Sequence, residues 1–198
     1  MILKIFYLNR SRKQQLILLH GLFSHPGFWL PYLPLFSNFQ CIIPYIDFNS
    51  LLTSKNSYNG QLSTIRNIII SSPDIIVIGH SLGSVFIENL PSKKHRGFAI
   101  CPMIGTKCIK KNLFLKYLVQ ATAHPYNHIK NVLDSSSKFL NTFNLPYNQN
   151  NLYFIPSNDH IFSYPTIAGS IAFHGDHFEI TNGIKACLNK VCHMQNLI

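Results

Sequence analysis

The chain has 198 residues, of which 46% are hydrophobic and 13% aromatic, which is enough for one domain with a sizeable core. This composition excludes an intrinsically disordered chain, and the longest apolar runs are too short to cross a bilayer. There are 17 Lys and Arg against 7 Asp and Glu, giving a formal net charge of +10. Such a charge favours acidic partners, namely nucleic acid, anionic lipid or an acidic carrier protein.

The first residues and the cysteines indicate the compartment. Residues 1–8 are apolar, with no basic region before them and no small-residue cleavage site nearby, so they predict a first strand and not a signal peptide. We therefore expect a cytoplasmic protein. The cysteines are five in number and form no C-x-x-C pair, which indicates structural thiols in a reducing compartment.

Short apolar runs alternate with helical segments through the first hundred residues. The polar stretch 47–60 predicts a loop. Strands are predicted at 2–8, 15–21, 41–46, 75–78 and 97–101, and helices at 26–36, 62–70 and 84–90. This alternation predicts an α/β fold, with a mostly parallel sheet covered by helices on both faces.

Residues 103–150 break this rhythm. Apolar residues recur there at helical spacing between 113 and 121, and a second, weaker helix is predicted from 127 to 139. We interpret 103–150 as a small helical cap inserted over the strand ends of a single domain that spans 1–198. Strands at 151–156 and 170–173 and a helix that ends near Cys192 complete the predicted elements.

A candidate nucleophile lies where the strand 75–78 meets the helix 84–90. The sequence Gly79-His-Ser-Leu-Gly83 follows the G-x-S-x-G pattern of a sharp strand-to-helix turn. Such a turn strains the serine backbone and requires small residues two positions to either side. It lifts the Ser81 hydroxyl above the strand ends, beside a helix N-terminus whose N–H groups stabilise an anion. A cysteine nucleophile is possible in principle, but no cysteine occupies a comparable turn.

A serine hydroxyl needs a base, usually histidine, and the base needs an acid that fixes its tautomer. In a parallel sheet these groups are expected at the carboxyl ends of strands. Asp159 follows the strand 151–156, and His177 follows the strand 170–173. The order Ser, Asp, His is the one known for hydrolases with this turn, so the predicted catalytic residues are Ser81, Asp159 and His177.

Alternatives remain for the acid, the base and a metal. Asp47 also follows a strand end, and His174 competes with His177 as the base. A metal site is conceivable, but no known ligand spacing is present, so we expect neither a metal nor another cofactor. The ligands of such a metal site would be His160, His174, Asp176 and His177.

The segment Leu18-Leu-His-Gly-Leu22 provides a second component of the expected site. Gly21 lets the backbone turn so that the following N–H groups face the cleft. We expect the main-chain N–H groups of Leu22 and Leu82 to bind the oxyanion that forms on a substrate carbonyl.

Four segments together resemble the α/β-hydrolase family. They are the strand and loop 18–22, the turn 79–83, the acid loop 158–162 and the segment Asp176-His-Phe178, in which Asp176 replaces the usual glycine. The resemblance covers nearly the whole chain in order. It implies the α/β-hydrolase fold and hydrolysis of an ester, thioester, amide or epoxide. It also implies a covalent acyl-enzyme, and the chain is most similar to the serine esterases.

The substrate is predicted from apolar and basic residues. An apolar slot for an acyl chain would be lined by Phe23, Trp29, Met103, Phe114 and Phe143. Basic side chains in the turn after the helix 84–90 and in the cap would dock an acidic carrier: Lys93, Lys94, Arg96, Lys110 and Lys111. This combination resembles the small α/β-hydrolases that cleave the methyl ester of pimeloyl-acyl carrier protein in biotin synthesis. We therefore expect a small acyl ester as substrate, carried on an acidic acyl carrier protein.

Other functions stay open at this point. A thioesterase or lipase-like esterase would use the same residues on other small acyl substrates. A catalytically inactive hydrolase fold would serve as a binding module. Nucleic-acid binding is suggested only by charge and by no recognised motif, so we expect neither nucleic acid as a partner nor stable insertion into a membrane. The oligomeric state is not predicted.

Overall fold

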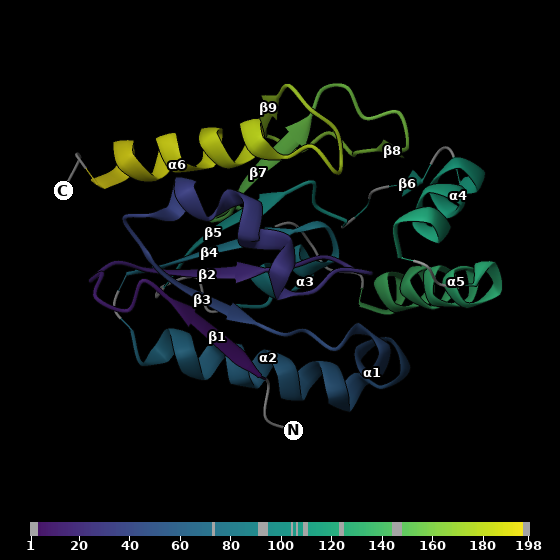
Figure 1. Cartoon of the computed structure of the whole chain (residues 1–198), viewed down its shortest axis with the longest axis horizontal. Coiled ribbons are helices and arrows are strands. Elements are labelled where there is room, and N and C mark those ends of the chain that lie inside the picture. Colours follow the sequence, from purple (N-terminus) through teal and green to yellow (C-terminus); the bar gives the residue numbers. More distant parts are fainter. Residues whose placement is uncertain are drawn as a thin grey trace.

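A seven-stranded sheet forms the centre of the computed structural model, with the strand order β1-β3-β2-β4-β5-β7-β9 (Figure 1). The edge strand β1 pairs antiparallel with β3, and the other strand pairs of this sheet are parallel. The structure describes residues 4–72, 74–90, 95–103, 105, 107–108, 111–122, 125–143 and 148–195. The strands are β1 (Ile5–Leu8), β2 (Gln15–Leu19), β3 (Gln40–Pro44), β4 (Ile75–His80), β5 (His95–Ile100), β7 (Leu152–Pro156) and β9 (Ile171–Phe173).

Helices cover both faces of this sheet, as predicted. One face packs against α1 (Phe48–Thr53), α2 (Lys55–Ile70) and α3 (Ser84–Glu88). The other packs against the 3₁₀ helix η1 (Pro26–Phe36) and the C-terminal helix α6 (Thr181–Gln195). Residues of the central strands alternate between the two cores and are buried on both sides, which explains their continuous apolar runs.

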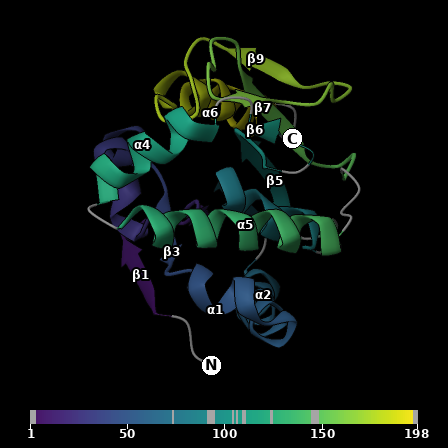
Figure 2. The ribbon, with the colours of Figure 1, turned by 90° about the vertical axis from the view of Figure 1, so that its right-hand side faces the viewer.

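Two further helices lie beyond the carboxyl ends of the parallel strands, within the segment predicted to be a cap (Figures 1 and 2). They are α4 (Lys111–Thr122) and α5 (Tyr126–Phe143), which pack against each other while α5 also contacts α1. A two-stranded antiparallel sheet of β6 (Lys107–Cys108) and β8 (Phe162–Ser163) was not predicted. No helix in the described parts of the chain is long and apolar enough to cross a bilayer.

The loop predicted for 47–60 is wrong, because this stretch forms α1 and the first part of α2. Asp47 begins α1, and its Oδ1 accepts hydrogen bonds from the N–H groups of Asn49 and Ser50 at 3.1 and 3.2 Å. The exposed side of α2 is polar, which hid the helical spacing of its buried side. That buried side consists of Tyr58, Gln61, Leu62, Ile65 and Ile69.

The contrast between two glycines gives a test of the fold. A methyl group on Gly83 would lie 2.5 Å from the carbonyl oxygen of His20 and 2.7 Å from that of Leu19. Gly83→Ala should therefore lower the free energy of unfolding by about 1–3 kcal/mol. A methyl group on Gly60, inside α2, would meet nothing within 4 Å, so Gly60→Ala should raise it by about 0.5–1 kcal/mol. Urea unfolding of both variants measures these effects, and equal midpoints would contradict the packing described for Gly83.

Candidate active site

Ser81 lies directly after β4 in a strained backbone conformation, as predicted. Its φ angle is +54°, a left-handed value that costs a non-glycine residue about 1–3 kcal/mol. The Oγ of Ser84 donates a hydrogen bond to the carbonyl oxygen of Ser81 at 2.6 Å and stabilises the turn. A methyl group on Gly79 would lie 3.0 Å from the oxygen of Gly83, so there is no room for larger residues on either side of the turn.

The imidazole of His177 lies beside this hydroxyl, with Nε2 2.9 Å from the Oγ of Ser81. The ring is packed against Phe162 and Phe178, with ring centroids 4.4 and 5.4 Å away. Burial lowers the pKa of His177 to about 3, so the ring is neutral at physiological pH and has a lone pair for a proton. The rival base, His174, is exposed, and its Nδ1 lies 3.1 Å from the side-chain nitrogen of Asn158.

Asp159 lies in the same hydrogen-bonded chain, but a tyrosine hydroxyl separates it from the histidine. The hydroxyl of Tyr164 is 2.8 Å from His177 Nδ1 and 2.9 Å from Asp159 Oδ2. Among the described residues, no direct hydrogen bond joins Asp159 to His177. The other carboxylate oxygen, Oδ1, accepts the N–H groups of Ile161 and Phe162, each at 2.8 Å. Sequence reasoning missed Tyr164, which is one of nine tyrosines and differs from the others only in following the acid loop.

The other acids near strand ends have structural partners. Asp47, the rival acid, caps α1. Asp176 Oδ1 accepts the N–H groups of Phe178 and Glu179, both at 2.8 Å, and so closes the turn that presents His177. This capping gives a local reason for an aspartate at the position where the α/β-hydrolase family, which the chain resembles, usually has glycine.

The loop after β2 passes directly beside the nucleophile. A methyl group on Gly21 would lie 2.7 Å from the Cβ and 3.2 Å from the Oγ of Ser81. The buried ring of His20 fixes this loop, because Nε2 accepts the N–H of Ile46 at 3.1 Å and Nδ1 donates to the Gly21 carbonyl at 3.0 Å. The N–H of Leu22 makes no hydrogen bond to any described residue and is therefore available to a ligand. The oxyanion role of Leu22 and Leu82 stays a prediction.

His80 contacts His177 through both its ring and a backbone hydrogen bond. Its ring stacks on Phe28 with centroids 4.8 Å apart, and its Nε2–H donates to the His177 carbonyl at 2.9 Å. His80 Nδ1 is buried and has no partner among the described residues. Burial lowers the pKa of His80 to about 3, so this ring is also neutral.

The described residues bring together one group of metal-ligating side chains, and it differs from the set considered from the sequence. It consists of His80, Cys101 and His177, whose ligand atoms lie within 4.8 Å of one another. Burial raises the pKa of the Cys101 thiol, which keeps it protonated. Because a metal binds the thiolate, and His177 Nε2 is already engaged by Ser81, this group is poorly suited to a metal ion.

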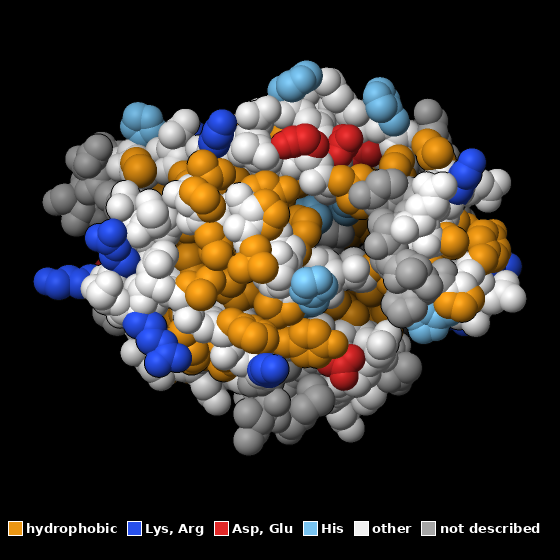
Figure 3. Space-filling view, in the orientation of Figure 1, with side chains coloured by type: hydrophobic (Ala, Val, Ile, Leu, Met, Phe, Trp, Pro, Cys, Tyr) orange, Lys and Arg blue, Asp and Glu red, His pale blue; other side chains and the backbone are white. Residues whose placement is uncertain are grey.

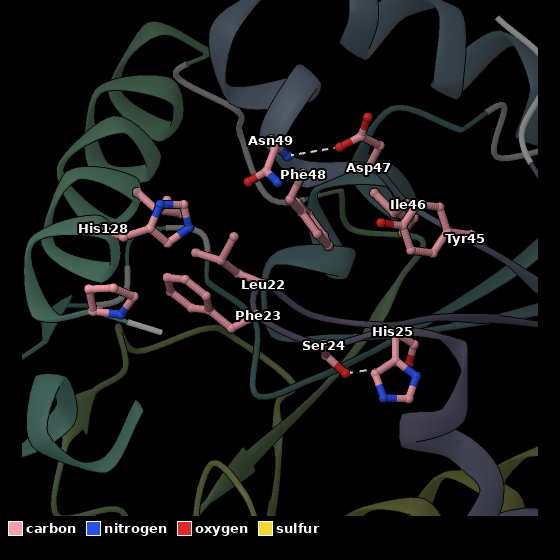
Figure 4. A pocket seen from close by; sticks show the side chains of 12 residues that line it. Leu22, Phe23, Ser24, His25, Tyr45, Ile46, Asp47, Phe48, Asn49 and His128 are labelled. Atoms are coloured by element: carbon pink, nitrogen blue, oxygen red, sulfur yellow. Dashed lines mark hydrogen bonds between the residues drawn. The ribbon is translucent and has the colours of Figure 1, made fainter. Parts of the chain in front are cut away.

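A cleft of about 740 Å³ opens beside the loop that follows β2. Figure 4 shows Leu22, Phe23 and Phe48 grouped between His128 on α5 and Tyr45 on the opposite side. This face of the molecule is hollowed beside α4 and α5 (Figure 3). Leu22 follows Gly21, which packs against Ser81, but neither Ser81 nor His177 is among the residues that line this cleft. Its lining also includes Ser24, His25, Ile46, Asp47, Asn49, Pro125 and Val132.

The predicted substrate residues are only partly placed by the structure. Trp29 is fully buried in the core between η1 and the sheet, so it does not line a slot, and this prediction is corrected. Phe114 is 8% exposed and packs edge-on against Phe162, with ring centroids 4.9 Å apart. Phe162 in turn packs against the ring of His177. Arg96 is half-buried on β5. The side chains of Phe143, Lys93, Lys94, Lys110 and Lys111 lie outside the described part of the chain.

Comparison with solved structures identifies the fold. A carboxylesterase from the thaumarchaeon Nitrososphaera gargenis matches with a TM-score of 0.57 and 13% identity over 98% of this chain and 94% of the other. The α/β-hydrolase enzyme MGS-MChE2, from a lagoon-sediment metagenome, matches with a TM-score of 0.59 and 13% identity over 99% and 100%. The NocB thioesterase domain, solved as a covalent fluorophosphonate complex, matches with a TM-score of 0.65 and 10% identity over 95% and 99%.

The sequence itself matches no protein-family model and no curated protein. The structural likenesses are low in identity and therefore show the fold alone. The chain has the α/β-hydrolase fold, as its resemblance to that family implied, and is similar in structure to esterases.

Three buried histidines make the stability of this protein sensitive to acid. Burial lowers the pKa values of His20, His80 and His177 to about 4, 3 and 3, from an ordinary 6.5. Below pH 6.5 the unfolded chain binds protons at these rings, whereas the folded chain does not until its own lower pKa values are reached. Acid therefore favours unfolding, and stability should change little between pH 7 and 8 and fall below pH 6.5 by about 1.4 kcal/mol per pH unit for each ring.

Urea unfolding at pH 8, 7, 6 and 5 measures this slope. A stability that stays constant down to pH 5 would contradict the burial of three neutral imidazoles.

Proposed function

We propose that this chain is a serine hydrolase that cleaves a carboxylic ester through Ser81, His177 and Asp159. The observation that carries the proposal is the Ser81 hydroxyl, held on a strained turn 2.9 Å from the Nε2 of a buried, neutral imidazole. A hydroxyl so placed can lose its proton to the ring as it attacks. The cleft beside the loop after β2 provides room for a substrate.

The reaction that we propose has two halves. His177 Nε2 takes the Ser81 proton while Oγ bonds to the carbonyl carbon, and the N–H groups of Leu22 and Leu82 bind the oxyanion. The imidazolium then gives its proton to the departing alcohol oxygen, which leaves an ester on Ser81. In the second half, His177 takes a proton from water while the water oxygen bonds to the acyl carbon. The bond from that carbon to Ser81 Oγ then breaks, the imidazolium returns its proton to Oγ, and the acid is released.

A fluorophosphonate probe, which forms a bond to an activated serine, tests this function. Labelling should occur once per chain, and Ser81→Ala should abolish it. His177→Ala should slow labelling by about 10²–10⁴-fold, because the hydroxyl loses its base. Rates are measured by mass spectrometry of the intact protein.

The matched control is His174→Ala, which should label at the wild-type rate because His174 is exposed and forms a hydrogen bond with Asn158. Loss of labelling in this variant would make His174 the base. A folded wild-type protein that does not label at all would favour the alternative of an inactive hydrolase fold that serves as a binding module.

For the substrate, we propose a small acyl ester, with the methyl ester of pimeloyl-acyl carrier protein as the specific candidate. The support is the formal net charge of +10 and a cleft that contains apolar side chains from Leu22, Phe23 and Phe48. Thioesters are the alternative, since the same serine chemistry cleaves them and structures similar to this chain include a thioesterase domain.

Salt dependence tests the proposed carrier. If a basic surface attracts an acidic carrier protein, kcat/KM for a carrier-bound ester should fall about tenfold or more between low salt and 0.3 M salt. The same acyl group as a free methyl ester is the control and should be insensitive to salt. Equal salt responses for both substrates would reject the carrier, and binding of RNA or DNA at physiological salt would instead favour the nucleic-acid alternative.

A further inference from the structure

We propose that Tyr164 is a positioning residue, which connects Asp159 to His177 and selects the tautomer of His177 that can accept the Ser81 proton. This inference rests on the proposed function, and it replaces the direct contact between acid and base with contact through a tyrosine hydroxyl. The carrying observation is the continuous chain from Ser81 Oγ to His177, to the Tyr164 hydroxyl and to Asp159 Oδ2, with distances of 2.9, 2.8 and 2.9 Å.

The protons in this chain have one catalytically useful arrangement. A carboxylate only accepts hydrogen bonds, so the single Tyr164 proton points to Asp159. The same hydroxyl must then accept a hydrogen bond from His177, which places the ring proton on Nδ1. Nε2 is therefore left with its lone pair facing the Ser81 hydroxyl. In the reverse arrangement Tyr164 donates to Nδ1, the ring proton lies on Nε2, and His177 cannot take the serine proton.

Asp159 is fixed so that it enforces this direction. Its Oδ1 accepts two backbone N–H groups, from Ile161 and Phe162, and this leaves Oδ2 for Tyr164. Burial, together with the neighbouring Cys101 and Asp159, raises the pKa of Tyr164. The hydroxyl therefore keeps its proton throughout the usable pH range. It donates to Asp159 and accepts from His177 without ionising.

Asp159→Asn should reverse the whole chain. The two N–H groups of Ile161 and Phe162 require an oxygen at the Oδ1 position, so the new NH₂ group must face Tyr164. Because that group donates, the tyrosine must donate to His177 Nδ1, which selects the idle tautomer. We expect labelling of Ser81 to slow by about 10³–10⁴-fold, as large as the loss when an asparagine imposes the wrong tautomer directly.

Tyr164→Phe should be less harmful, because it removes the hydroxyl without imposing a wrong tautomer. A loss of about 10–100-fold is expected, which corresponds to one hydrogen bond to a ring that becomes charged. The double variant Tyr164→Phe with Asp159→Asn should behave like Tyr164→Phe alone. It should therefore label faster than Asp159→Asn, because the asparagine can no longer reach the ring through the hydroxyl.

This rescue distinguishes the proposal from its alternatives. If Asp159 contacted His177 directly in solution, the double variant would be as slow as Asp159→Asn. If Tyr164 had only a packing role, the two losses would multiply. Either result, or a wild-type rate for Tyr164→Phe, would overturn the proposal.

The imidazole tautomer is a second readout that does not depend on activity. Nitrogen-15 NMR, with His177 assigned by comparison with His177→Gln, should show protonated Nδ1 in the wild type and protonated Nε2 in Asp159→Asn. If the wild-type protein does not label but shows these tautomers, the proposed function fails while the role of Tyr164 stands. If both proteins have the same tautomer, the role of Tyr164 is rejected even when labelling succeeds.

Tyr153→Phe is the matched control for the loss of a buried tyrosine hydroxyl. Tyr153 also donates to a carboxylate, that of Glu88 at 2.9 Å, but it packs in the core on the α2 and α3 side of the sheet. Its removal should lower the urea midpoint of unfolding and leave labelling and the His177 tautomer unchanged.

Discussion

The left-handed backbone of Ser81 is the constraint on which the rest of the site depends. That conformation is unfavourable for a serine, and the packing around it has to hold it in place. Gly83 lies against the backbone of Leu19 and His20, so the turn after β4 and the loop after β2 are fixed to each other. The same packing brings Gly21 against Ser81 and so determines where a substrate carbonyl can lie. The two central strands therefore position both the nucleophile and the expected oxyanion loop.

The polar groups around Ser81 act through dipoles and lone pairs more than through full charges. His20, His80 and His177 are neutral because they are buried. The Gly21 carbonyl orients His20, the His177 carbonyl orients His80, and the Tyr164 hydroxyl contacts the ring of His177 itself. The full negative charge, on Asp159, lies beyond the Tyr164 hydroxyl.

The sequence was sufficient for the parts of the fold that depend on local patterns. The seven strands of the main sheet, the turn at Ser81 and the identity of its neighbouring histidine followed from short apolar runs, glycine spacing and chain order. The helices within 47–60 were missed because their buried apolar residues are a minority among polar ones. Trp29 was misplaced because the sequence does not distinguish an aromatic side chain in a hydrophobic core from one that lines a binding slot. Tyr164 could not be found, because its position between Asp159 and His177 depends on how two loops meet in space.

The geometry favours catalysis over a binding role because its main features lower the stability of the folded state. A strained serine and buried neutral histidines both lower the stability of the folded state, and a binding module needs neither. A surface for a ligand can be built from unstrained loops and from charged groups exposed to water. Here the strain is directed at one hydroxyl, the imidazole lone pair faces that hydroxyl, and a carboxylate with both oxygens engaged controls the ring through a tyrosine. These features act together only if a proton leaves Ser81, and this is the reason to expect Ser81 to be a nucleophile.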